Sequence, residues 1–162
     1  MSQDQSHISD AIEDLLNSLQ SVQLATLNAE QHPEISYTPV LRFEGRYYIF
    51  ISELASHTQN ILLQPKLLLL FIEDERSAKN IFARKRLSLN VLASECEQGN
   101  EQWELILDEF EKRQGKTVSL LKQLPDFHLF KLTPESGTFV QGFGQAFELS
   151  GENLHIIKAK TV

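Results

Sequence analysis

Residues 22–52 read VQLATLNAEQHPEISYTPVLRFEGRYYIFIS. Apolar and polar residues alternate along this stretch, and a period of two is typical of β-strands rather than helices. Polar links that contain Pro33 or Gly45 divide the stretch into β-segments at 22–27, 35–38, 40–43 and 47–52. Since no helical segment separates them, the stretch predicts an antiparallel meander rather than a β-α-β alternation.

The flanking sequence adds helices and further strands. Helical spacing of apolar residues predicts helices at about 8–20, 53–64 (with Leu54, Ile61 and Leu62 inward), 97–113 and 118–124. Strands are expected at 67–72, 79–92, 127–132 and 138–149, with a turn at 134–137 and a weakly patterned tail at 154–162. The sum predicts an α+β, mainly β fold: an antiparallel barrel-like sheet with flanking helices, because closing a sheet removes its exposed edges.

Length and composition restrict the class of protein. The 162 residues, 41% hydrophobic and 23% charged, predict a single globular domain over 1–162. A formal net charge of −7 argues against a nucleic-acid partner. The longest apolar run, 67–72, is too short to span a membrane, and residues 1–5 lack the features of a signal peptide. The single cysteine, Cys96, excludes an internal disulfide and multi-cysteine zinc sites, so a cytoplasmic location is expected.

The densest group of positive charges is Arg84-Lys85-Arg86, within the strand expected at 79–92. Because side chains alternate along a strand, Arg84 and Arg86 are expected on one face and Lys85 on the other. Two guanidinium groups placed in this way can clamp a phosphate or a carboxylate, so the group is a candidate anion site. The alternative interpretation is a solvated edge strand whose charges deter aggregation.

Histidine and glycine motifs offer less specific signals. His57 lies near an expected helix start, where it could meet an anion; the alternative is an ordinary surface histidine. No two of the five histidines have the spacing of metal ligands, so the sequence assigns no metal ligand. Gly142-Phe143-Gly144 lacks the third glycine and the helix of a dinucleotide-binding loop, which favours a β-bulge or a close backbone approach.

A set of short segments carries a family resemblance: VQLATL at 22–27, ISYTP at 35–39, IS at 51–52, ASHTQN at 55–60, IEDE at 72–75, IFARKRL at 81–87, DFHLF at 126–130 and FVQGFGQA at 139–146. Together they resemble the pyridoxamine 5'-phosphate oxidase-like, FMN-binding split-barrel family. The last four resemble more narrowly its haem-utilisation (HugZ/HutZ) branch, whose members degrade haem. The resemblance covers about residues 10–150.

This resemblance implies a homodimer of split barrels with two ligand sites at the seam, which hold haem or, in flavin-binding relatives, FMN. Arg86 matches an arginine near the haem, with Arg84 and Lys85 beside it, and His57 matches a position that lines the cleft. Asp126 matches an acidic residue that hydrogen-bonds the axial histidine of the partner chain, which makes it the candidate catalytic residue. Three more residues of the matched segments are expected to line the same site: Ser52, Asn60 and Thr38.

The axial histidine of that branch lies in a C-terminal Gly-His segment, and residues 154–162 contain no Gly-His pair. The iron ligand is therefore unassigned, and its role is not transferred to His155. Three functions remain as hypotheses. The preferred one is oxygen-dependent haem degradation with an unidentified electron donor. The alternatives are an FMN-binding oxidoreductase, with FMN phosphate on the basic residues, and a haem-binding module without turnover.

Overall fold

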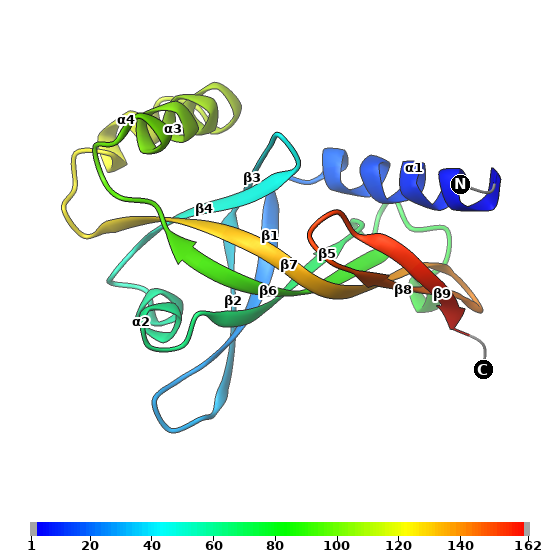
Figure 1. The fold of residues 1–162 in the computed structure, drawn as a ribbon. Helices are drawn as coiled ribbons and strands as arrows, with labels where there is room; N and C mark the ends of the chain where they lie inside the picture. Colours follow the sequence, from blue (N-terminus) through cyan, green and yellow to red (C-terminus); the bar gives the residue numbers. More distant parts are fainter. Residues whose placement is uncertain (1–2, 161–162) are drawn as a thin grey trace.

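The structure, a computed structural model, describes residues 3–160, and Figure 1 shows how the elements lie in space. Within these residues, nine strands join in one sheet in which every pairing is antiparallel. The strands are β1 (Ser21–Leu27), β2 (Pro33–Pro39), β3 (Leu41–Phe43), β4 (Arg46–Ser52), β5 (Lys66–Ile72), β6 (Arg86–Glu95), β7 (Phe127–Gly142), β8 (Gln145–Ser150) and β9 (His155–Lys160). The predicted α+β, mainly antiparallel class is confirmed.

In the described part of the chain, four α-helices and one 3₁₀ turn flank the sheet. They are α1 (Gln3–Ser18), α2 (Ser56–Leu63), α3 (Glu101–Gln114), α4 (Thr117–Leu121) and the 3₁₀ turn η1 (Ile81–Ala83). In Figure 1, α1 and the α3–α4 pair lie at opposite ends of one side of the sheet, and α2 lies on the other side. None of the helices in the described part of the chain is both long and apolar enough to cross a bilayer.

The strand order is β2-β1-β5-β6-β7-β4-β3, and β8 and β9 extend from β7. The first four strands therefore form two hairpins, β1–β2 and β3–β4, at the two ends of this path. The predicted meander is wrong between β2 and β3, because β4 pairs with β7, where Ile49 lies opposite Phe130. This long-range pairing leaves no local signal in the sequence.

Two hydrophobic clusters hold the elements together. In the larger cluster, α1 packs on the sheet through Ile8, Ile12, Leu15 and Leu16, each at most 8% exposed. In the smaller cluster, α3 packs on β4 and β7 through four apolar side chains: Trp103, Ile106, Leu107 and Phe110. Asn100 caps α3, since its side-chain oxygen accepts a hydrogen bond from the backbone N–H of Trp103 at 2.8 Å.

Several predicted boundaries are wrong. The helix expected from residue 53 begins at Ser56, and Leu54 is 93% exposed and Leu62 44% exposed, whereas Ile61 is buried. The tail expected at 154–162 instead contains β9 as far as Lys160, and residues 161–162 lie outside the described residues. The helices expected at 97–113 and 118–124 are α3 and α4, whose bounds are shifted by a few residues.

The turn expected at 134–137 does not exist, because β7 continues through it for 16 residues. Gly137 lies so close to β6 that a Cβ atom there would come within 2.7 Å of the Ser88 carbonyl oxygen. The chain reverses instead between Gly142 and Gln145, where Gly144 has a positive φ of 67°. A register irregularity between Val140 and Gly142 agrees with the bulge predicted there.

Candidate functional site

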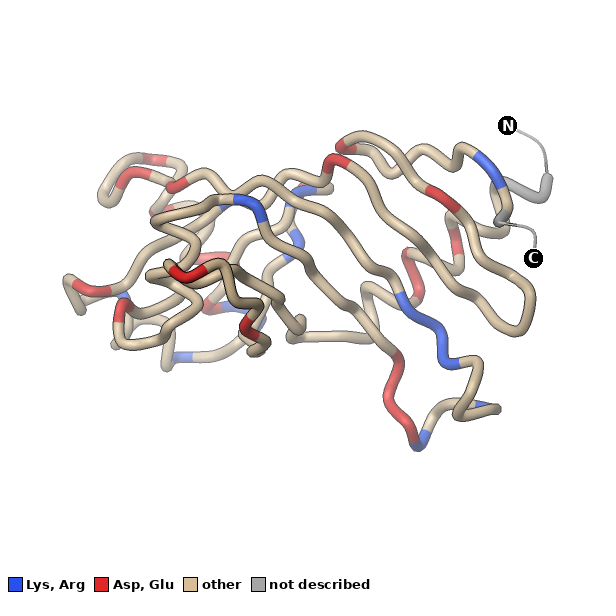
Figure 2. The backbone as a smooth tube through the Cα atoms, turned by 90° about the horizontal axis from the view of Figure 1, so that it is seen from below, with Lys and Arg blue, Asp and Glu red and all other residues tan. Residues whose placement is uncertain are grey.

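The basic segment begins before the strand that was expected to carry it. Residues 81–83 form η1, and β6 starts only at Arg86, so Arg84 and Arg86 do not project from one strand face as predicted. The Arg84 guanidinium donates to the backbone carbonyl of Glu73 through Nε, at 3.0 Å, and through Nη2, and it pairs with Glu75 at 3.3 Å. Figure 2 shows the acidic run 73–75 and the basic run 84–86 on the two sides of the loop that joins β5 to β6. Arg84 therefore fixes the loop between β5 and β6, and its contact with a ligand stays a prediction.

Arg86 and Lys85 carry positive charges that no carboxylate of the described residues neutralises. The half-buried Arg86 donates from Nη1 to the carbonyl oxygen of Arg84 at 3.1 Å. Neither side chain has a carboxylate partner among residues 3–160. The neighbouring Phe82 is 83% exposed. This corner of the molecule thus presents positive charge beside an apolar ring, in a protein whose net charge is −7.

Asp126 and Ser52 form a second group, at the other end of β7. The Ser52 hydroxyl donates to Asp126 Oδ2 at 2.6 Å, and the backbone N–H of Glu53 donates to the Asp126 carbonyl oxygen at 2.8 Å. Ser52 also receives a hydrogen bond from the Leu54 N–H, so its position is fixed by the turn that leads into α2. The structure therefore brings the predicted residues Asp126 and Ser52 together.

His57 lies in the first turn of α2, and its Nδ1 is 2.8 Å from the Ser36 hydroxyl. Burial lowers the pKa of His57, so the imidazole is neutral at neutral pH. Because Ser36 engages Nδ1, the other ring nitrogen is the one that could contact a ligand. The predicted placement of His57 near a helix start is confirmed, and its role in binding stays a prediction.

Asn60 and Thr38 are buried rather than surface residues; each is 4% exposed. Asn60 donates to Thr26 Oγ1 at 3.0 Å and to Glu34 Oε2 at 2.9 Å, which ties α2 to β1 and β2. The hydrogen bond from Asn60 is the main cause that lowers the pKa of Glu34. Asn60 therefore positions α2, and with it His57, and its own contact with a ligand stays a prediction.

Sequence reasoning missed a carboxylate–imidazole cluster beside Asp126. His128 lies two residues further along β7, with Nε2 2.6 Å from Glu53 and Nδ1 2.5 Å from Glu95, and its ring stacks on Phe130. Burial opposes protonation of His128, but the hydrogen bonds and charges of the two carboxylates outweigh it and raise the pKa. The three residues are far apart in sequence, so only the β4–β7–β6 pairing brings them together.

This cluster predicts a pH-dependent contribution to stability. A histidine whose pKa is raised in the folded state stabilises that state fully below its unfolded pKa of about 6.5, and this stabilisation is lost as pH rises through the folded pKa. At pH 6 we expect the unfolding free energy of wild type to exceed that of His128→Gln by about 1 kcal/mol. The expected difference is no larger because both carboxylates are partly exposed to solvent. Urea denaturation between pH 6 and 9 checks this, and a difference that grows with pH would contradict it.

A single chain does not bring all the predicted site residues together. Arg86 lies opposite Val140 near one end of β7, and Asp126 immediately precedes the other end. Residue 140 lies fourteen positions beyond residue 126, which corresponds to roughly 45 Å of extended strand at about 3.3 Å per residue. Figure 1 shows β7 crossing most of the molecule between these ends. His57 lies at the same end of the molecule as Asp126. The helix that carries it, α2, leads into the first residue of β5, whereas Arg86 pairs with the last residue of β5, Ile72.

An apolar face lies on the outer side of β1, β2 and β5. Ile35 is 78% exposed, Tyr37 is 70% exposed and Leu68 is 45% exposed. Two hollows open on this face, with volumes of about 180 and 270 Å³, and both contain Ala25 and Leu68. The smaller hollow reaches Ser88, which is two residues from Arg86 and so on the same side of β6. Apolar surface of this kind, continuous with a basic corner, is typical of a binding face.

The geometry can be compared with known proteins. The sequence pattern described as pyridoxamine 5'-phosphate oxidase matches residues 8–141. The chain is 39% identical over 150 residues to the protein named heme oxygenase HutZ of Vibrio cholerae serotype O1, and the match spans 93% of this chain and 85% of that protein.

Two solved structures share both fold and sequence. The crystal structure of Vibrio cholerae HutZ, there described as a heme storage protein, matches with a TM-score of 0.76 and 35% identity over 89% of this chain and 96% of that one. Campylobacter jejuni ChuZ matches with a TM-score of 0.86 and 37% identity over 97% of this chain and 65% of that one. The fold is therefore the split barrel that the sequence resemblance implied, and the chain belongs to the pyridoxamine 5'-phosphate oxidase family, in the branch that contains HutZ and ChuZ.

Proposed function

We propose that two copies of this chain bind haem at the seam between them and that the protein acts in haem utilisation. The observation that carries the proposal is the separation of the two groups of site residues at opposite ends of β7, together with an exposed apolar face on β1, β2 and β5, the strands next to β6 in the sheet. A twofold axis through that face would bring the Arg86 end of one protomer to the Asp126 end of the other. The names of the relatives, heme oxygenase and heme storage protein, support haem as the ligand.

The residues present fit the chemistry of haem. Its propionates are carboxylates, and Arg86 and Lys85 offer charged donors without a carboxylate partner among the described residues. The flat apolar macrocycle would lie against the exposed side chains of Ile35, Tyr37 and Leu68. The net negative charge of the protein slows the approach of an anionic ligand. The local positive charges of Arg86 and Lys85 are therefore needed to offset this repulsion at the site.

The residues around Asp126 would act at the other side of the ligand. Bound haem supplies iron that activates oxygen against the porphyrin itself. Asp126, whose Oδ2 accepts from Ser52, is held where it can accept a hydrogen bond from a ligand or from a partner residue. Ser52 thereby fixes the orientation of the carboxylate, and the neutral His57 can contact the ligand without adding charge. A cytoplasmic location completes the proposal, since the lone Cys96 provides no internal disulfide.

Whether the bound haem is consumed distinguishes a haem-degrading enzyme from a haem-storage protein. We propose degradation, because the named relative is a heme oxygenase, although its solved structure is described as a storage protein. Haem-loaded protein given ascorbate and oxygen is expected to lose its Soret band and release iron. A Soret band that persists under these conditions would instead establish binding without turnover.

FMN is the alternative ligand. The matching family pattern is described as pyridoxamine 5'-phosphate oxidase, and the phosphate of FMN would bind the same basic side chains, Arg86 and Lys85. Absorption spectra of the purified protein, before and after equimolar haem and FMN, decide between the two. A Soret shift that saturates at one haem per chain is expected. A bound flavin spectrum, with no response to haem, would overturn the haem proposal.

Replacement of Arg86 by alanine is expected to lower haem affinity by about 10- to 100-fold. A charge-assisted hydrogen bond to a carboxylate contributes about 1.5–3 kcal/mol, and the variant loses it without disturbing an internal ion pair. Haem titration followed at the Soret band measures the effect. The matched control is Arg76→Ala, which removes an exposed arginine from the adjacent loop and should leave affinity unchanged. Equal affinities in wild type and Arg86→Ala would remove Arg86 from the site.

A further inference from the structure

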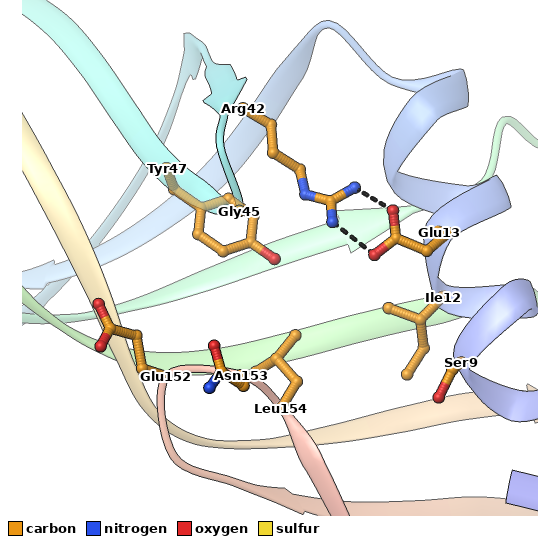
Figure 3. A pocket seen from close by; sticks show the side chains of 9 residues that line it. All are labelled: Ser9, Ile12, Glu13, Arg42, Gly45, Tyr47, Glu152, Asn153 and Leu154. Carbon is orange, nitrogen blue, oxygen red and sulfur yellow. Dashed lines mark hydrogen bonds and ion pairs between the residues drawn. The ribbon is translucent and has the colours of Figure 1, made fainter. Parts of the chain in front are cut away.

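A second, polar pocket lies away from the proposed haem site, between α1, the β3–β4 hairpin and the β8–β9 turn. Figure 3 shows its lining, which includes Glu13 of α1, Arg42 and Tyr47 of the hairpin, and Asn153 and Leu154 of the turn. Its volume is about 230 Å³. This is below the roughly 300 Å³ at which sites for drug-sized ligands begin, so an occupant must be small.

Arg42 supplies one unsatisfied donor to this pocket. Its two terminal nitrogens bind the carboxylate of Glu13 in a bidentate pair, with Nη1 2.5 Å from Oε2. The remaining donor, Arg42 Nε, is buried and makes no hydrogen bond of good geometry with the described residues, although the Tyr47 phenol oxygen lies close enough to interact with the Arg42 guanidinium. A buried donor left without a good acceptor destabilises the folded protein, so an acceptor that reaches Nε would recover this lost stability.

Tyr47 supplies a second donor close to the first. Its side chain is 2% exposed, and its hydroxyl lies beside the Arg42 guanidinium and points into the pocket (Figure 3). Burial raises the pKa of Tyr47 to about 12, so the phenol keeps its proton at neutral pH. A single acceptor oxygen could therefore meet both the Tyr47 hydroxyl and Arg42 Nε.

The charges of the pocket cancel in pairs. Arg42 is neutralised by Glu13, and Glu152 at the rim is neutralised by Arg46. A free anion or cation would lose hydration without gaining a counter-charge, which disfavours both. The side-chain amide of Asn153 can donate or accept, and Ile12 and Leu154 form an apolar wall (Figure 3).

Backbone strain marks the same pocket. Leu154 has a positive φ of 51°, a conformation that is costly for a residue with a Cβ atom. The turn keeps this conformation and thereby places both Asn153 and Leu154 against Tyr47 and α1. Conformations of this kind are concentrated at sites where a ligand or a function requires a set shape.

We propose that this pocket binds a small, net-neutral carboxamide. Its carbonyl oxygen accepts from Arg42 Nε and the Tyr47 hydroxyl, its amide nitrogen donates to Asn153, and its short aliphatic part lies on Ile12 and Leu154. Because α1, the β3–β4 hairpin and the β8–β9 turn each contribute lining residues, the bound ligand fastens the helix to the barrel.

Three probes of nearly the same shape and different charge test this proposal: isobutyramide, isobutyrate and isobutyramidinium. Titration of each into the full chain at pH 7, followed by backbone amide NMR, should give saturable shifts at Gly45, Asn153 and Leu154 for isobutyramide. The two charged probes are expected to bind at least tenfold more weakly. Tighter binding of a charged probe, or no saturable shift with any of the three, would overturn the proposal.

Tyr47→Phe removes only the hydroxyl and is expected to weaken isobutyramide about tenfold. Its matched control is Tyr48→Phe, because Tyr48 is the next residue in β4, is 3% exposed and packs into the other hydrophobic cluster. An equal loss in both variants would mean that the hydroxyl acts through general stability, and the assigned contact would be wrong. Haem titration of the same variants shows that the two sites are separate if the haem affinity of Tyr47→Phe is that of wild type.

Discussion

Leu68→Asp is expected to convert the protein to a monomer and to lower its haem affinity by more than 100-fold. Leu68 lies at the centre of the exposed apolar face, beside Ala25 of β1 and Asn90 of β6. In the proposed dimer its side chain would be buried, and a carboxylate buried there without a partner costs several kcal/mol. Since the proposed haem site combines the Arg86 end of one protomer with the Asp126 end of the other, dissociation would separate its two halves.

The measurement is light scattering together with haem titration of the same samples. The matched control is Leu105→Asp, because Leu105 is 50% exposed on α3 whereas Leu68 is 45% exposed on the sheet. The control should remain dimeric and bind haem as wild type does, and circular dichroism should show that both variants are folded. A Leu68→Asp variant that is monomeric and still binds haem with unchanged affinity would show that one protomer contains the whole site.

Much of the fold could be predicted because its signals are local. The i, i+4, i+7, i+8 pattern of Ile8, Ile12, Leu15 and Leu16 specifies the buried side of α1. The alternation in β1 is equally clear, since Val22, Leu24 and Thr26 are buried and their neighbours are not. The alternation of apolar and polar residues predicts only a barrel-like sheet, and the segments that resemble the family identify it as a split barrel.

The errors arise where a contact distant in sequence overrides the local pattern. Arg84 resembled a strand residue beside Arg86, but the Glu73 carbonyl holds its guanidinium and the chain forms η1 instead. For the same reason the His128 cluster was missed, since neither Glu53 nor Glu95 is near it in sequence. The separation of Arg86 from Asp126 also has no local signal, because it follows from the pairing of β6 with β7.

Pro134 and Gly137 misled the prediction most clearly. Both residues favour turns, so a turn at 134–137 was expected where β7 runs straight on. In the structure Pro134 lies opposite Val91, next to a register irregularity between Asn90 and Val91, where a missing N–H is tolerated. Gly137 has no positive φ and is required for a different reason, the closeness of β6.

Gly137→Ala is therefore expected to destabilise the fold by about 3 kcal/mol. A Cβ atom at this position would lie 2.7 Å from both Leu89 Cδ2 and the Ser88 carbonyl oxygen. The leucine side chain is fully buried and the carbonyl belongs to the sheet, so neither can move without cost. Because β6 carries Arg86 at its start, the shift should also displace the basic corner and weaken haem binding.

The control comes from the same strand. At Gly142 a Cβ atom would meet only the flexible Gln145 side chain, at an ordinary 3.6 Å, so Gly142→Ala should change the unfolding free energy by less than about 1 kcal/mol. Urea denaturation of both variants separates a steric effect from a loss of glycine flexibility, because the flexibility lost is the same in each. Similar stabilities for the two variants would mean that β6 and β7 are not in the close contact on which the register of the whole sheet depends.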